Sequence, residues 1–159
     1  MAKAKRAPKT PLFLDNGQSS FEKAKIIATP IPFEGAISYM SGAALGPKAI
    51  LEASSQVELF DFEHDIDLST TPIHTVAIPK IKNLASMRKF VSGVVEKVDT
   101  DRQFYLGIGG DHTVTIPTIE TLAEKFPNFG IVQFDAHADL RDTLHGNKYS
   151  HACIMRRNA

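Results

Sequence analysis

Apolar residues recur every three or four positions along residues 84–98, the spacing that places side chains on one face of a helix. A second helix is predicted from about Ile116, where Pro117 is tolerated in the first turn and apolar residues follow at helical spacing. The dipeptide Gly46-Pro47 opens a third predicted helix, which runs to about residue 59. The stripe on the first of these helices consists of Leu84, Met87, Val91, Val94, Val95 and Val98.

Short apolar runs alternate with these helices and indicate strands at 26–28, 74–78, 104–108 and 129–134. The last run is almost wholly apolar, which is typical of a strand that is covered on both faces. Strands that alternate with helices favour an α/β fold with a parallel sheet.

The 159-residue chain is long enough for one domain with a sizeable core. Its 43% hydrophobic and 23% charged residues exclude collagen-like, low-complexity and wholly disordered proteins. Cys153 is the single cysteine, which excludes an internal disulfide framework and fits a reducing, cytoplasmic environment. No apolar run approaches the ~18 residues that a membrane span needs, so no membrane partner is expected.

The formal net charge is zero, but positive charge is concentrated at the start of the chain. Lys3, Lys5, Arg6 and Lys9 precede every acidic residue, and no apolar segment follows them to make a signal peptide. Residues 1–20 are therefore predicted to form a flexible basic tail. Nucleic-acid binding by this tail is the alternative. No other basic cluster supports that alternative, so no nucleic-acid partner is expected.

The segment 134–139 (FDAHAD) carries two carboxylates and an imidazole at alternate positions directly after a predicted strand. Residues two apart point to the same side of an extended backbone, so Asp135, His137 and Asp139 can converge. The carboxyl ends of parallel strands are also where open α/β sheets place their sites. Two neighbouring carboxylates are costly without a cation, so a metal is the simplest interpretation. The alternative is that the two aspartates cap a helix beside a structural histidine.

Residues 109–112 (GGDH) also follow a predicted strand directly, and their glycines allow close approach of the backbone. The imidazole of His112 would therefore lie at the same sheet edge as the first cluster. Mixed imidazole and carboxylate ligands fit manganese, zinc or iron, and a carboxylate-rich set favours manganese. Asp111, beside this ligand, is predicted to support it rather than to bind the metal.

Other candidate residues have simpler interpretations. Residues 64–67 (HDID) imitate a metal motif but lie in an acidic stretch, which indicates a solvated loop. Cys153 lies two residues from His151, but a buried small residue on a following helix is preferred over a cysteine–histidine dyad. His151 taken by itself indicates a surface-loop histidine.

The two motifs together resemble the paired signatures of the ureohydrolase family, which includes arginase and agmatinase. Residues 42–50 (GAALGPKAI) are similar to an early Gly-x-x-x-Gly-Pro-x-x-Ile segment of the family. Residues 140–142 and 149–152 resemble the agmatinase-like branch more than arginase. The resemblance implies a three-layer α/β/α, arginase-like fold with a mainly parallel sheet. Residues 21–159 would then be the N-terminal portion of a ureohydrolase domain.

The resemblance also implies a binuclear Mn²⁺ site. Asp135 would bridge the two ions. His112 and Asp139 would bind one ion, and His137 would bind the other. His151 matches the proton-shuttling or substrate-side histidine of the family, and it would protonate the leaving amine.

The implied reaction is hydrolysis of a small guanidino substrate, with agmatine giving putrescine and urea. Arginine, guanidinobutyrate and formimidoylglutamate are the alternative substrates, and the resemblance implies a homo-oligomer for the full-length protein. A third family signature, Ser-x-Asp-x-Asp-x-x-Asp-Pro, supplies further metal ligands but does not occur in this sequence. The chain is therefore expected to be a truncated, N-terminal half. The alternative function is a catalytically inactive fragment that at most binds one metal or a partner.

Overall fold

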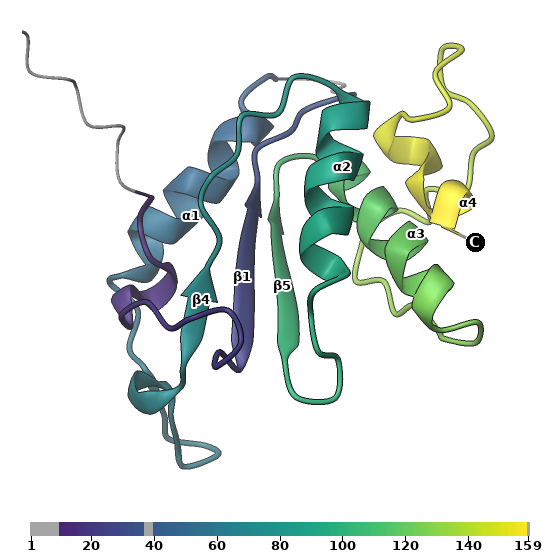
Figure 1. Ribbon diagram of the computed structural model, residues 1–159. Helices are drawn as coiled ribbons and strands as arrows, with labels where there is room; N and C mark the ends of the chain where they lie inside the picture. The colour runs from purple at the N-terminus through teal and green to yellow at the C-terminus, as the bar shows by residue number, and fades with distance from the viewer. Residues whose placement is uncertain (1–9, 37–39, 159) are drawn as a thin grey trace, which may run out of the picture.

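A parallel sheet of three strands forms the centre of the computed structural model, which describes residues 10–36 and 40–158 (Figure 1). The strand order is β4-β1-β5, and Ile26 of the central strand pairs with Ile73 on one side and Phe104 on the other. Three of the four predicted strands are thus confirmed. Their bounds are Ile26–Ile31 (β1), Ile73–Thr75 (β4) and Phe104–Gly109 (β5).

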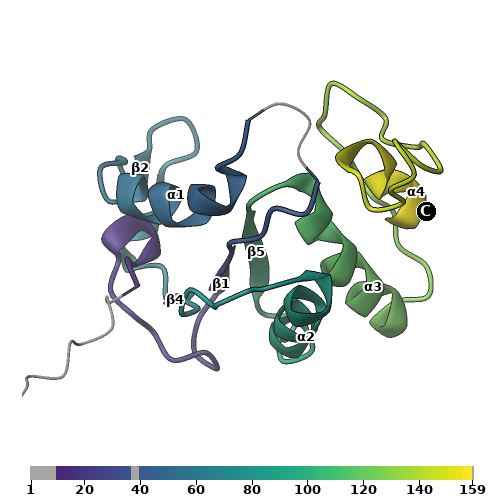
Figure 2. The ribbon, with the colours of Figure 1, turned by 90° about the horizontal axis from the view of Figure 1, so that it is seen from above.

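Helices cover both faces of this sheet (Figure 2). Helix α1 lies on one face, while α2 and α3 pack against each other on the opposite face. The predicted three-layer α/β/α arrangement is therefore confirmed. Across the part of the chain that the structure describes, no helix is both long and apolar enough to cross a membrane. The helices span Gly46–Ser54 (α1), Leu84–Val95 (α2), Thr115–Lys125 (α3) and Ile154–Asn158 (α4).

The core is built on β1, which is buried on both faces because its side chains alternate between the two layers. Ile31 packs with the apolar stripe of α2, whereas Ala28 packs with Leu51 of α1. The predicted stripe is correct, since Met87, Val91, Val94 and Val95 are all buried. Asn83 caps α2 by accepting a hydrogen bond from the Ser86 N–H (2.9 Å), which fixes where that helix begins.

Shorter elements connect these layers. An exposed antiparallel hairpin, β2 (Phe60–Asp61) and β3 (Ile66–Asp67), includes the acidic residues 64–67 that were predicted to lie in a solvated loop. Single turns of 3₁₀ helix lie at Phe13–Asp15 (η1), Ala43–Leu45 (η2), Leu68–Thr70 (η3), His112–Val114 (η4) and His151–Cys153 (η5).

Residues 10–20 lie against the sheet, in contrast to the flexible tail predicted for residues 1–20. The side chain of Gln18 donates to the Thr75 carbonyl and accepts from the Thr75 N–H, both at 3.0 Å. These bonds follow the free edge of β4, a position that sequence periodicity does not reveal. The basic cluster of the predicted tail lies at residues 3–9, outside the described residues.

The fourth predicted strand, residues 129–134, is not formed. This segment has no regular secondary structure, and Val132 and Phe134 are 80% and 98% exposed. The prediction was wrong because a continuous apolar run forms a buried strand only where a neighbouring strand and two covering layers are available. Among the described residues, β5 pairs with β1 on one edge and has no strand on its other edge.

Candidate metal centre

The loop after β5 carries His112 and is held closely against the end of β1. A side chain at Gly110 would collide with the carbonyl of Phe33, so only glycine permits this approach. The Gly110 N–H donates to Ile31 O (3.2 Å), which extends the strand pairing into the loop. The glycines of the GGDH motif thus fix the backbone from which His112 projects.

Asp111 caps the short helix η4 that begins with His112. Its Oδ1 accepts a hydrogen bond from the Thr113 N–H (3.0 Å). Its Oδ2 accepts from the N–H groups of Gly35 (2.7 Å) and Ala36 (2.9 Å) in the loop after β1. The prediction that Asp111 supports the ligand stays a prediction, and these contacts show which backbone groups it holds.

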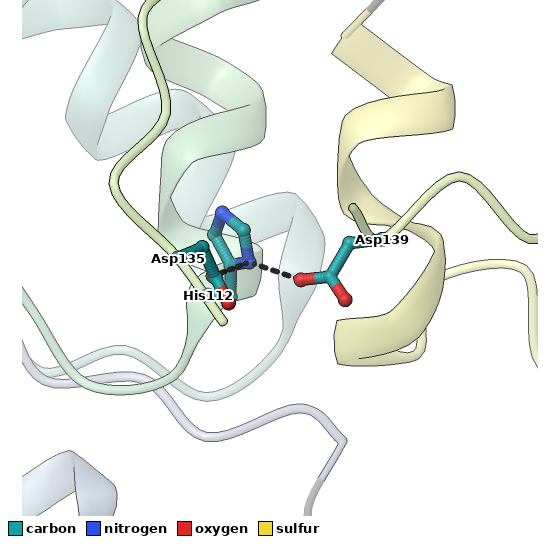
Figure 3. A group of neighbouring side chains, drawn as sticks. All are labelled: His112, Asp135 and Asp139. Atoms are coloured by element: carbon teal, nitrogen blue, oxygen red, sulfur yellow. Dashed lines mark hydrogen bonds and ion pairs between the residues drawn. The ribbon is translucent and has the colours of Figure 1, made fainter. Parts of the chain in front are cut away.

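His112, Asp135 and Asp139 come together at one point (Figure 3). The Nδ1 atom of His112 lies 2.8 Å from Oδ2 of Asp139 and 3.7 Å from Oδ2 of Asp135. One ligand atom from each residue lies within 4.8 Å of the others. The side chain of Asp139 is only 8% exposed, so this carboxylate is enclosed rather than solvated. We call this cluster the metal triad.

The metal triad has the donor set of a divalent-cation site. Two carboxylates and one imidazole suit manganese, zinc or iron, and the open remainder of the coordination sphere leaves room for water or substrate. The backbone N–H of His137 donates to Asp135 (2.9 Å), and this hydrogen bond lowers the pKa of the Asp135 carboxyl. The carboxylate form that a cation requires is therefore favoured.

Asp139 is fixed from behind by the C-terminal helix. Its backbone lies in the left-handed region (φ 51°), which a non-glycine residue seldom adopts. Its carbonyl oxygen accepts a hydrogen bond from the Arg156 N–H of α4 (3.2 Å). Asp139 is thus held in place by α4 instead of by a strand.

His137 lies outside the metal triad. Its side chain is 82% exposed, and its Nδ1 is 3.7 Å from Oδ1 of Asp135. Alternation along an extended backbone predicted that His137 would converge with Asp135 and Asp139, but residues 134–138 are not a strand. The structure therefore brings together three of the four predicted metal ligands.

His151 begins η5 and lies beside the loop after β1. Its Nδ1 is 3.3 Å from the Ala36 carbonyl oxygen and 3.5 Å from the Ser150 hydroxyl. His151, Asp139 and His137 line one open cavity of about 560 Å³, together with Arg141. The predicted proton-transfer residue and two predicted metal ligands thus face a common space.

The remaining sequence candidates lie elsewhere. His64 pairs with Asp61 (2.9 Å) on the exposed hairpin, which agrees with a solvated segment. Cys153 is fully buried, as expected for a small packing residue. The part of the site that sequence reasoning missed is the loop at 33–36. The signal was present in Pro30, Pro32 and Gly35, which mark a long loop at the carboxyl end of a strand, where parallel sheets gather their sites.

Comparison with known proteins identifies the family. Residues 24–159 match the sequence profile of the arginase family. The chain belongs to the arginase family. It is 34% identical to an N(1)-aminopropylagmatine ureohydrolase of Synechocystis over 152 residues, and 33% identical to an agmatinase of Pyrococcus horikoshii over 142 residues. These matches cover 87% and 84% of this chain, but 48% and 47% of the relatives.

Solved structures confirm the arginase-family fold. The agmatine ureohydrolase of Thermoplasma volcanium superposes with a TM-score of 0.81 at 28% identity, over 91% of this chain and 49% of that protein. A proclavaminate amidino hydrolase of Streptomyces clavuligerus has the same fold, with a TM-score of 0.75 at 21% identity over 96% of this chain and 52% of that protein. This arginase-family chain spans about half the length of the relatives that it matches.

Proposed function

We propose that the function of this arginase-family chain is the Mn²⁺-dependent hydrolysis of a guanidino compound to urea and an amine. The observation that carries the proposal is the metal triad, in which an imidazole and two carboxylates from separate loops converge within 4.8 Å. Family membership supports the same reaction class, because the relatives are named as ureohydrolases and agmatinases.

The residues of the triad fit a resident Mn²⁺ ion. His112, Asp135 and Asp139 would hold one ion, and the exposed His137, beside Asp135, would serve a second. When bound, Mn²⁺ supplies Lewis-acid activation of water for attack on an electrophilic carbon. The enclosed carboxylate of Asp139 would orient His112 through their 2.8 Å contact before any ion is bound.

The protein's own groups would bind the substrate and move a proton. His151 lines the same cavity as Asp139, so a guanidinium bound in that cavity would lie near both residues. We assign His151 the role of donating a proton to the leaving amine, because expulsion of an unprotonated amine is unfavourable. His151 would also contact the substrate.

Agmatine is the substrate that we propose, with putrescine, a polyamine precursor, as the amine product. The similar relatives carry two names, agmatinase and N(1)-aminopropylagmatine ureohydrolase. Agmatine extended by an aminopropyl group is therefore the first alternative. Arginine, guanidinobutyrate and formimidoylglutamate follow, and they differ from agmatine in carrying a carboxylate.

One observation favours a second function, metal binding without turnover. The described residues gather ligands for a single ion, and His137 remains 82% exposed. A single ion held by three protein ligands binds Mn²⁺ without the second centre that the family resemblance implies. The two functions differ in whether urea is released.

The test measures urea release from agmatine, aminopropylagmatine and arginine with added Mn²⁺, and Mn²⁺ affinity by calorimetry. Asp135→Asn keeps the shape of a triad residue but removes its charge. Asp142→Asn is the matched control, because Asp142 follows Asp135 in the same loop but lies outside the triad. Its carboxylate pairs with Arg156 of α4. Urea release that disappears in Asp135→Asn but persists in Asp142→Asn supports the hydrolase.

The other outcomes separate the two functions. Mn²⁺ binding that depends on Asp135 without urea release supports metal binding alone. Mn²⁺ affinity that is equal in Asp135→Asn and in the unaltered chain contradicts both functions, because the triad would then not be the metal site.

A further inference from the structure

Residues 129–134 have two faces with different surroundings. Phe129, Ile131 and Gln133 line a hollow of about 740 Å³ beside α3 and α4, whereas Val132 and Phe134 are 80% and 98% exposed. This alternation is the pattern of a strand, in which successive side chains point to opposite faces. The segment thus has one face against helices and one bare apolar face.

The backbone of this segment is unpaired as well. Within residues 10–36 and 40–158, no hydrogen bond reaches a backbone N–H or carbonyl group of residues 127–134. A row of unpaired backbone groups is a template for pairing with another strand. A neighbouring strand would therefore satisfy the backbone and cover part of the bare face at the same time.

The chemistry of the segment indicates which partner fits it. Residues 126–134 (FPNFGIVQF) include no charged residue, so a strongly charged partner finds no opposite charge there. The formal net charge of the chain is zero, so two copies do not repel each other at long range. An uncharged apolar strand with free edges is complementary to itself. A second copy of this chain is the partner that these properties favour.

The exposed surface is large enough for a weak dimer. Burying one phenylalanine side chain removes about 150–250 Å² from water. The exposed parts of the apolar side chains in this segment therefore offer roughly 500 Å² per copy, or about 1,000 Å² for two copies. That area is near the lower limit for specific interfaces. The side chains are those of Phe126, Phe129, Ile131, Val132 and Phe134.

We propose that residues 129–134 pair in antiparallel orientation with the same residues of a second copy, related by a two-fold axis. The register that keeps both bare faces on one side places Val132 opposite Val132 and Phe134 opposite Gly130. The ring of Phe134 then covers a residue that has no side chain. Because Asp135 follows Phe134 directly, pairing also restrains the backbone of one residue of the metal triad.

Sedimentation velocity of the unaltered chain tests the dimer without metal or substrate. We expect a dissociation constant of about 50 µM, which is weak for a specific interface. Most copies are then monomers at about 5 µM and dimers at about 500 µM. Amide hydrogen exchange at alternate residues of 129–134 should be about fivefold slower at the higher concentration, because antiparallel pairing occupies alternate N–H groups.

Val132→Lys and Val132→Glu test the register. Each variant alone places like charges opposite each other across the two-fold axis, so each should weaken the dimer at least about tenfold. An equimolar mixture of the two variants should recover association, because opposite charges then face each other. Phe62→Lys is the matched control, because Phe62 is 88% exposed between β2 and β3 and lies outside the segment. It should leave the dimer unchanged.

The outcomes separate this interface from other ones. A chain that stays monomeric at the higher concentration overturns the proposal, and the bare face is then open to a different polypeptide. Slower exchange along β5 instead of at residues 129–134 also overturns it, because the interface would then be the free edge of the sheet. Equal association of the two Val132 variants alone and mixed overturns the two-fold pairing. None of these outcomes depends on whether the chain releases urea.

Discussion

His112 and Asp139 contact each other across 2.8 Å, yet the segments that carry them are built very differently. His112 follows β5, which pairs with β1 along all six of its residues and ends in a clamped loop. Asp139 follows residues 129–134, which form no strand and include a Phe134 that is 98% exposed. The part of the site that carries His112 is supported by the sheet, and we call it the sheet arm. The part that carries Asp139 is supported by α4 through Arg156, and we call it the α4 arm.

This difference shows that convergence of ligands does not require two neighbouring strands. The arm on the sheet is fixed by a ladder of backbone hydrogen bonds between β5 and β1, and the side chains of β1 are buried on both faces of the sheet. The arm on α4 is fixed by a few polar contacts around Asp139. Regions with few buried apolar contacts open more readily, so the two arms should differ in local stability.

The largest expected effect tests whether stability resides in the sheet and its covering helices. Met87 of α2 is fully buried, and Met87→Ala should lower the free energy of unfolding by about 2–5 kcal/mol. Val132→Ala, at a site 80% exposed in the segment before Asp135, should change it by less than about 0.5 kcal/mol. Urea unfolding followed by circular dichroism measures both. Equal losses would mean that the segment at 129–134 contributes to the core.

The second prediction compares the two histidines of the site. His112→Ala should weaken Mn²⁺ binding at least about a hundredfold, because loss of a mere supporting partner already costs 10–100-fold. His137→Ala should have a much smaller effect on the affinity for the most tightly bound Mn²⁺ ion, since the side chain of His137 is 82% exposed. Titration calorimetry gives both affinities. A larger loss in His137→Ala would place the tightest site outside the metal triad.

The third prediction concerns Tyr105, which lies on the sheet arm. Burial raises the pKa of the Tyr105 hydroxyl above its usual value. Tyrosine in the unfolded chain ionises near pH 10, so stability should fall as pH rises through and above about 10. Tyr105→Phe should show a shallower fall, measured by urea unfolding at several alkaline pH values. If the free energy of unfolding falls equally steeply with pH in Tyr105→Phe and in the unaltered protein, Tyr105 is not responsible for the loss of stability.

The smallest effect concerns the surface between α2 and α3. Arg88 makes two hydrogen bonds to Glu120 (3.0 and 2.8 Å), and its guanidinium carbon lies 5.4 Å from the centre of the Tyr149 ring. Both partners are partly exposed, so Glu120→Gln should cost about 0.2–1 kcal/mol, and less in high salt. Glu52→Gln on α1, which removes the pair with Lys48, is the control for a single-helix contact.

The sheet arm could be predicted well from the sequence because its signals are local. The stripe of α2 follows from the spacing of its apolar residues, and the runs at β1 and β5 have strand character. The motif at 109–112 likewise predicts a close backbone turn, and the collision that any side chain at Gly110 would meet gives the physical reason.

The other arm could not be predicted in the same way. The apolar run at 129–134 has strand character, but strand formation depends on a partner edge and on covering layers that lie far away in sequence. Alternation therefore misplaced His137, whose side chain is 82% exposed and lies outside the triad of His112, Asp135 and Asp139. The docking of residues 10–20 along β4 is also a matter of tertiary packing.

The sequence by itself determined the family, the alternation of strands and helices, and the residue types of a metal site, because these depend on spacing and chemistry within short segments. Only the tertiary structure decided which ligands meet. It joined His112 to Asp139 across 27 positions, and it placed Ala36 between Asp111 and His151. The physical reason is that hydrogen bonds between loops depend on how the elements pack, and local residue preferences do not specify that packing.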